Sequence, residues 1–156
     1  MVKNMSPAEG LADIRQTMKF YDQCLDSVRQ RHGLSRLETV IISFLHNNPG
    51  RDTVGEIADI RMLSRGNVSR GAYSLIRRGL LDRLPDQKDR RSVHLLLRPE
   101  AAPVVGEIEE AMKVFRQLAF AGFSDEDMAA FRTLNQKLAD NVSRNLERSV
   151  SGRAEQ

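Results

Sequence analysis

The sequence predicts a mainly α-helical protein of the α+β class, in which one short β-hairpin interrupts a series of helices. Helix starts are marked by a Ser or Thr followed three residues later by an acid, and this pattern occurs at Ser6, Ser35, Thr53 and Ser124. Long segments near both ends have apolar residues at alternating spacings of three and four. Between them, two short apolar runs flank a charged segment, which is typical of a strand, a turn and a strand. A chain of 156 residues, 40% of them apolar, can bury a core without a metal or a disulfide.

The expected helices cover residues 6–31, 35–47, 53–61, 64–79, 100–121 and 124–148. The first helix has a heptad-like apolar seam, formed by Leu11, Ile14, Met18, Tyr21, Leu25 and Val28. The last helix continues a similar spacing at Phe131, Leu134, Leu138 and Val142. A seam this narrow favours a partner helix, and in so short a chain we expect packing across a two-fold axis. The alternative is an ordinary helical bundle within one chain.

The middle of the chain has the pattern of a helix-turn-helix followed by a hairpin. Two short helices, 53–61 and 64–79, meet at a tight turn, and Ser64 can cap the second one. Gly79 ends that helix, and strands are expected at 80–85 and 92–98 with a charged tip between them. A hairpin in this place is called a wing.

Positive charge is concentrated in the same region. The net charge is +3, but residues 61–98 contain ten Lys or Arg against three Asp, a net +7 in 38 residues, so the remainder is −4. A basic block in a mildly acidic frame indicates a polyanion-binding face, although a solvated arginine-rich surface gives the same count.

These motifs resemble the MarR-type transcription regulators. The resemblance rests on the run Ser64-Arg-Gly-Asn-Val-Ser-Arg-Gly, on the Gly79-Leu80 turn, and on Asp89-Arg90-Arg91 followed by Leu95-Leu96-Leu97. It covers residues 8–148 in the order of elements and 53–99 in motif detail. The chain departs from the family at Arg98 and Pro99, where Thr and then Gly are common, so we expect a different exit from the wing.

The resemblance implies a division of the chain and a set of partners. Residues 1–33 and 100–150 would form a helical dimerisation region, residues 34–99 a winged helix-turn-helix that binds DNA, and residues 151–156 a disordered tail. The partners would be a second copy of the chain and double-stranded DNA with a pseudo-palindromic operator. Such a regulator would be a repressor released by a small aromatic or phenolic effector.

Candidate site residues follow from the motifs and the resemblance. Arginine can bridge guanine and asparagine can bridge adenine in the major groove, and the recognition-helix candidates are Ser64, Arg65, Asn67, Ser69, Arg70 and Ser74. The wing candidates are Lys88, Arg90 and Arg91, with Asp89 orienting Arg91. The effector-pocket candidates are Met18, Tyr21, Phe44, Met112 and Phe115, for which a place in the core is the favoured alternative.

Other functions find little support in the sequence. The three histidines have no metal-binding spacing and there is no phosphate-binding glycine loop, so we expect neither an enzyme nor a cofactor or metal site. Cys24 is expected to be a buried structural thiol. No signal peptide or membrane-spanning run is present in the sequence, so a cytoplasmic protein without a membrane partner is expected. The remaining alternative is a winged-helix module that binds protein without specific DNA binding.

Overall fold

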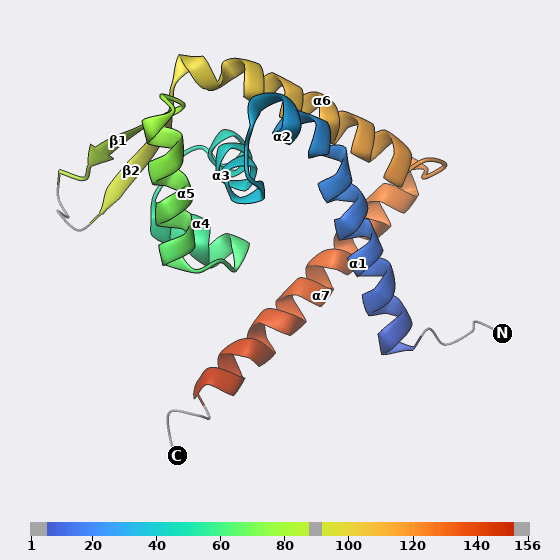
Figure 1. Cartoon of the computed structure of the whole chain (residues 1–156). Helices are drawn as coiled ribbons and strands as arrows, with labels where there is room; N and C mark the ends of the chain where they lie inside the picture. Colours follow the sequence, from blue (N-terminus) through green and yellow to red (C-terminus); the bar gives the residue numbers. More distant parts are fainter. Residues whose placement is uncertain (1–5, 88–91, 152–156) are drawn as a thin grey trace. The chain divides into compact units, whose positions relative to one another are not determined.

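The computed structural model describes residues 6–87 and 92–151 (Figure 1). Its helices and its one antiparallel sheet follow the predicted order, and the mainly α-helical class is confirmed. The elements are α1 (Pro7–Cys24), α2 (Asp26–His32), α3 (Arg36–Asn47), α4 (Val54–Arg61), α5 (Arg65–Arg77), β1 (Leu81–Pro85), β2 (Val93–Leu97), η1 (Pro99–Ala101), α6 (Ala102–Ala119) and α7 (Asp125–Ser151).

The single helix predicted over residues 6–31 is wrong, because the chain forms two helices that meet at Leu25. Leu25 has φ −91° and ψ −7°, and the break turns both Leu25 and Val28 into the core. The carbonyl of Asp22, near the end of α1, accepts a hydrogen bond of 2.7 Å from the Arg29 guanidinium in addition to one of 3.1 Å from the Leu25 amide. No glycine or proline lies at this break, so the apolar spacing alone predicts one continuous helix across it.

The predicted caps form at the helix starts. Ser6, Ser35 and Thr53 each accept a backbone hydrogen bond from a glutamate three residues later, whose carboxylate accepts the return bond. The same reciprocal pair joins Ser124 and Asp127, at 3.0 and 3.1 Å. These local hydrogen bonds explain why the helix starts are predictable from the sequence.

The core lies between α3, α4, α5 and the sheet. Its most deeply buried apolar side chains include Ile41, Ile42, Ile57, Leu75 and Leu81. Leu25 and Val28 from the α1–α2 junction extend this core, together with Val104 and Ile108 from α6. The helix-turn-helix and the first helices therefore share one apolar interior.

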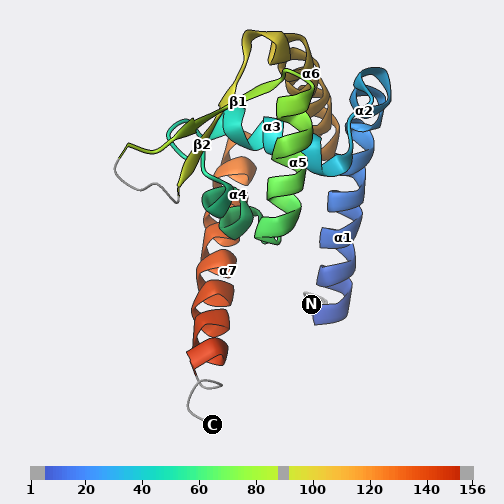
Figure 2. The same ribbon diagram turned by 60° about the vertical axis from the view of Figure 1, so that its left-hand side comes forward.

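The hairpin is joined to the helix-turn-helix at two places. Gly79, at φ +72°, turns the chain from α5 into β1, a conformation that glycine adopts without a steric penalty. Strand β2 pairs with β1 with Leu81 opposite Leu97, and the Leu95 amide donates a 2.8 Å bond to the Asp52 carbonyl just before α4 (Figure 2). The second strand thus passes the start of α4.

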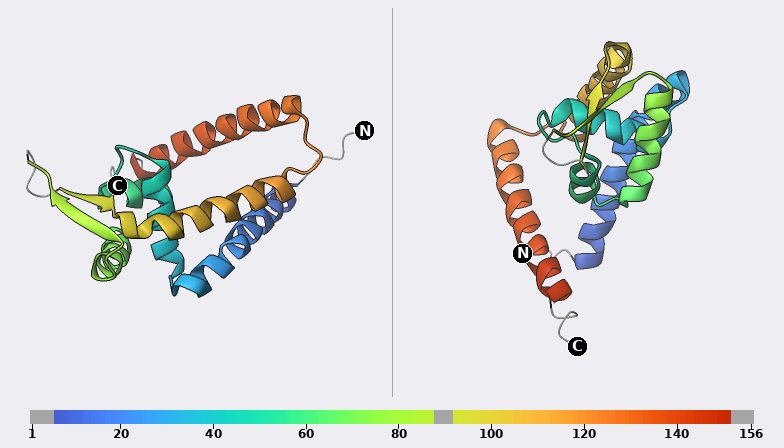
Figure 3. Two further views of the ribbon diagram at one scale, coloured as in Figure 1. Left: turned by 90° about the horizontal axis from the view of Figure 1, so that it is seen from above. Right: turned by 90° about the vertical axis from the view of Figure 1, so that its left-hand side faces the viewer.

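Helix α6 leaves the hairpin through η1 and runs beside α1 and α2, as the view from above shows (Figure 3). Contacts within the chain divide it after Ala119. In the second unit, Phe120, Phe123 and Phe131 pack edge to face at the start of α7, with ring centroids 5.2 to 6.4 Å apart. In the part of the chain that the structure describes, no helix combines the length and the apolar character needed to cross a bilayer.

Candidate nucleic-acid interface

Recognition helix α5 has one buried and one exposed face. Val68, Ala72 and Leu75 are buried, and Ser64 caps the helix by accepting a 3.2 Å bond from the Asn67 amide. The predicted contact residues Arg65, Asn67, Ser69 and Arg70 are all exposed. The helix therefore presents charged and amide groups from its first two turns to solvent.

Gly71 explains how closely α5 packs on α3. A Cβ atom at this position would lie 2.8 Å from Ile41 Cδ1 and 3.0 Å from Leu37 Cγ. A methyl group at these distances would require the Ile41 and Leu37 side chains to shift, so glycine permits the close approach of the two helices. Gly66, five residues earlier and on the exposed side, has nothing within 4 Å of such a Cβ.

Glu38, a buried residue of α3, also holds the recognition helix. Its carboxylate accepts a 2.7 Å bond from the Ser74 hydroxyl and lies 3.6 Å from the Arg78 guanidinium. Burial raises the pKa of Glu38, but hydrogen bonds from Ser35 and Ser74 and the charge of Arg78 outweigh this effect, so its pKa lies below the ordinary value. The carboxylate is therefore charged at neutral pH and joins α3 to α5.

This arrangement engages Ser74 within the chain, and its contact with DNA stays a prediction. Its side chain is half-buried and its hydroxyl is bonded to Glu38 within the chain. Arg78 is likewise engaged, since it also donates to the backbone carbonyls of His32 and Gly33. Arg78, one of the basic residues between positions 61 and 98, thus stabilises the fold.

Two exposed residues of α5 were missed by the sequence analysis. Tyr73 is 62% exposed and Arg77 is exposed, three and seven residues after Arg70, which places all three on one helix face. Extending the outward face by helical periodicity would have found both. Arg70 also donates a hydrogen bond to the Asn67 side chain, so the two predicted base readers contact one another.

The wing carries charge at its base as well as at its predicted tip. Lys88, Asp89, Arg90 and Arg91 lie outside the described residues, so their contacts, including the orientation of Arg91 by Asp89, stay predictions. At the base, Arg98 pairs with Asp82 at 3.0 Å and with Glu100 at 3.1 Å.

His94 in β2 lies between two carboxylates. Its Nδ1 is 2.5 Å from Asp52 Oδ1 and its Nε2 is 2.9 Å from Asp86 Oδ2. The hydrogen bonds to Asp52 and then Asp86 raise the pKa of His94 to about 9, against a small opposing effect of burial. Among residues 6–87 and 92–151, no group of three His, Cys, Asp or Glu could hold a metal ion.

A cavity of about 780 Å³ contains three of the five predicted effector-pocket residues, Met18, Tyr21 and Phe115. The Tyr21 and Phe115 rings meet edge to face, with centroids 5.4 Å apart. The other two candidates do not line this cavity: Phe44 is buried in the core and Met112 packs against it, which agrees with the favoured alternative for these residues. Residue type alone does not predict whether an apolar or aromatic side chain lies in the core or lines a cavity.

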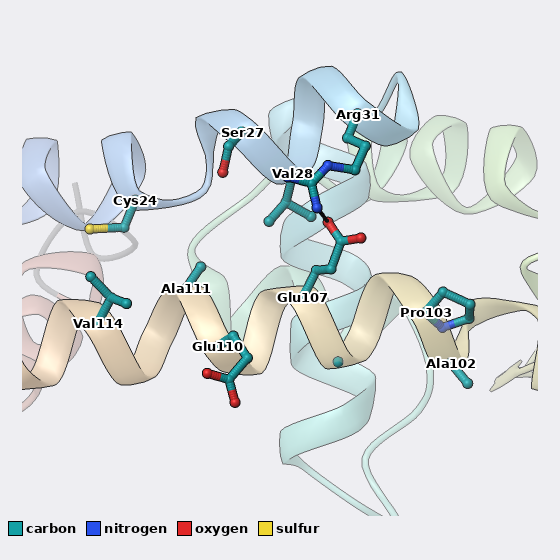
Figure 4. A pocket seen from close by; sticks show the side chains of 11 residues that line it. Cys24, Ser27, Val28, Arg31, Ala102, Pro103, Glu107, Glu110, Ala111 and Val114 are labelled. Atoms are coloured by element: carbon teal, nitrogen blue, oxygen red, sulfur yellow. Dashed lines mark ion pairs between the residues drawn. The ribbon is translucent and has the colours of Figure 1, made fainter.

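A second cavity, of about 740 Å³, lies between the α1–α2 junction and α6 (Figure 4). Cys24 lines it and is only half-buried, which differs from the expected buried thiol. Arg31 and Glu107 form an ion pair of 2.9 Å across it.

The predicted dimer seam is exposed in part. Leu11, Ile14 and Met18 on α1 are exposed, whereas Leu25 and Val28 are core residues of the single chain and Tyr21 is half-buried. Including Leu25 and Val28 in the seam was therefore wrong. On α7, the predicted seam residues Phe131, Leu134 and Leu138 are all exposed.

The fold and the arrangement of charges on the recognition helix can now be compared with known proteins. Residues 32–92, which contain the helix-turn-helix and most of the hairpin, match the model of the MarR family. This stretch of the chain is similar to the MarR family. PetP of Rhodobacter capsulatus, an HTH-type transcriptional regulator, is 25% identical over 119 residues, which are 76% of this chain and 71% of PetP.

Solved structures of other proteins share the fold. A MarR protein from Peptoclostridium difficile is 19% identical and superposes with a TM-score of 0.78, covering 93% of this chain and 94% of that one. Bordetella bronchiseptica BpsR, whose DNA binding is regulated by 6-hydroxynicotinic acid, is 20% identical with a TM-score of 0.64, covering 81% and 95%. The likeness to these structures shows that the chain has their winged helix-turn-helix fold.

Proposed function

We propose that this chain is a MarR-type regulator, a homodimeric, sequence-specific repressor that an aromatic effector releases from DNA. The observation that supports this proposal is the exposure of the polar and charged side chains in the first two turns of α5. Arg65, Asn67 and Arg70 are the side chains that recognise guanine and adenine edges in the major groove. Gly71 and Glu38 hold the helix against α3, so the reading face is rigid.

The proposal assigns a separate function to each part of the chain. Residues 34–99 would form the DNA-binding part, and residues 1–33 and 100–150 would pair two copies. Exposed apolar residues support pairing, because α1, α6 and α7 each leave several in water, among them Leu11, Leu118 and Leu134. Two copies related by a two-fold axis would read a pseudo-palindrome with half-sites about 10 bp apart, centre to centre.

The effector would occupy the 780 Å³ cavity. Its lining combines the apolar groups of Met18, Tyr21 and Phe115 with side chains of the α4–α5 turn. Four cationic residues line it against one acid, Asp22; they are Arg15, Lys19, Arg36 and Arg61. This balance favours a small aromatic acid, the class to which the BpsR effector belongs. Because the cavity touches both α1 and the turn before α5, a ligand there would alter the position of the recognition helix.

The experiment is a fluorescence-anisotropy titration of the full chain against labelled duplexes from the promoter beside its own gene, with scrambled duplexes as controls. We expect cognate affinity to exceed scrambled affinity by about 10³-fold or more. If a dimer makes 6–10 phosphate contacts, affinity should also fall roughly 10³- to 10⁵-fold between 50 and 200 mM salt. A weak, salt-independent interaction with every duplex would instead favour a protein-binding module.

A further inference from the structure

His94 joins three segments that are far apart in the sequence. It lies in β2 opposite Leu84 of β1, and its backbone makes an isolated β-bridge with Thr53, the cap of α4. Its ring contacts Asp52, one residue before that cap, and Asp86, one residue after β1. The imidazole therefore links the outer part of the hairpin to the start of the helix-turn-helix.

The geometry sets the protonation state of this ring. An ionised carboxylate accepts hydrogen bonds but cannot donate, and a neutral imidazole has one donor and one acceptor nitrogen. With carboxylate oxygens 2.5 Å from Nδ1 and 2.9 Å from Nε2, both nitrogens must donate. Only the imidazolium does so, and the raised pKa of about 9 agrees with this. The bridge is consequently in place at neutral pH.

The other charged side chains near the ring are few, and some of them are already bonded to other residues. Arg51 and Glu56 belong to the segment that carries Asp52, and Glu56 is bonded to Thr53. On β1, Asp82 lies on the same sheet face as His94 but pairs with Arg98, and Arg83 lies on the opposite face. Lys88, Asp89, Arg90 and Arg91 of the tip are outside the described residues. Within the described part, Asp52 and Asp86 are thus the two charges that the ring contacts directly.

We propose that His94 is a positioning residue for DNA binding, whose imidazolium holds the wing to the start of α4 so that wing and recognition helix reach one duplex together. A hairpin of two strands is marginally stable by itself. It needs an external attachment to keep its tip at a fixed distance from α5. The proposal rests on the proposed DNA-binding function.

The first test examines the bridge without DNA. In ¹⁵N NMR of the full chain at pH 7.5, with the signal assigned by its loss in His94→Gln, both ring nitrogens should have imidazolium shifts and should titrate near pH 9. The Leu95 amide, which bonds to the Asp52 carbonyl, should exchange with deuterium faster in His94→Gln. A neutral ring at pH 7.5, or unchanged Leu95 exchange, would overturn the bridge.

The second test measures DNA affinity for wild type, His94→Gln and the control His46→Gln, whose ring lies 2.7 Å from the single carboxylate of Glu109 on α6. We expect His94→Gln to bind cognate DNA roughly tenfold more weakly at pH 7, the order of one lost charged hydrogen bond. This deficit should shrink as the pH approaches 9. His46→Gln should bind like wild type at every pH.

Two further variants keep the proposal testable if His94→Gln folds poorly. Asp52→Asn keeps the side-chain size and should weaken binding in the same direction. His94→Arg keeps a positive charge with several donors and should restore most of the affinity. Faster Leu95 exchange with unchanged DNA affinity would overturn the positioning role, whereas wild-type protein that fails to bind any duplex would refute the proposed function but leave the NMR result intact.

Discussion

Gly66 and Gly71 lie five residues apart in recognition helix α5, yet their surroundings differ. Gly71 lies against Ile41 and Leu37, whereas Gly66 has open space where a side chain would be. Glycine in a helix costs up to about 1 kcal/mol relative to alanine. That cost is explained by close packing at Gly71 and has no explanation within the chain at Gly66.

Gly71→Ala is expected to destabilise the protein by about 1–3 kcal/mol, because the new methyl group overlaps buried side chains of α3. Gly66→Ala is the matched control and should stabilise it by up to about 1 kcal/mol. Urea unfolding of both variants measures the free energies. Shifts of the same sign would show that the tight α3–α5 contact does not determine the effect.

Arg70 and Arg90 separate base reading from phosphate attraction. Arg70→Ala should weaken cognate binding by roughly 1–3 kcal/mol per half-site and scrambled binding much less, since its exposed guanidinium is placed to read a base edge. Arg90→Ala should weaken both equally and reduce the salt slope by about one unit per lost contact. Titrations on both duplexes at three salt concentrations test this, and an equal loss for Arg70→Ala would remove its role in base reading.

At the scale of elements, the attachment of α5 to α3 depends on the Glu38 carboxylate. Ser74→Ala should cost about 1–3 kcal/mol because the buried Glu38 carboxylate loses a donor, and Glu38→Gln should cost a similar amount because it removes the negative charge that faces Ser74 and Arg78. The pKa of Glu38 is below the 4.5 expected when unfolded, so its contribution is present above about pH 4.5 and is lost as the pH falls through the lower folded value. Urea unfolding between pH 7 and pH 3 should show the Glu38→Gln deficit decrease as the pH falls below about 4.5.

The attachment of the hairpin has the opposite pH dependence. The pKa of His94 is raised from 6.5 to about 9, so its contribution to stability is full below about pH 6.5 and is lost as the pH rises through about 9. The stability difference between wild type and His94→Gln should therefore decrease from pH 6 to pH 9.5. A difference that stays constant over this range would contradict the charged bridge.

At the scale of the whole molecule, the exposed apolar helix faces predict self-association. Ile14 on α1 and Ile60 on α4 are 46% and 45% exposed, and only Ile14 belongs to the predicted seam. Ile14→Glu should weaken dimerisation by about 1.5–3 kcal/mol for each buried copy, while Ile60→Glu should leave it unchanged. Analytical ultracentrifugation at micromolar concentration measures this, and a monomeric wild type would refute the dimer.

Local interactions explain what the sequence alone determines here. A capping box involves residues three apart and a strand alternates with period two, so both patterns can be read from the sequence. The helix starts at Ser35, Thr53 and Ser64 and the turn into the hairpin at Gly79 were therefore predictable. The basic residues of the recognition helix can be found by counting charges. The family motifs lie in the same stretch.

The remaining features depend on contacts between distant segments, which only the tertiary structure decides. Leu25 ends a helix because the core lies to one side of it, and Ser74 turns inward because Glu38 of α3 lies opposite. His94 is charged because folding brings Asp52, 42 residues away, to its ring. The free energies of burial and of charge pairing depend on these neighbours, and neither residue type nor spacing specifies them.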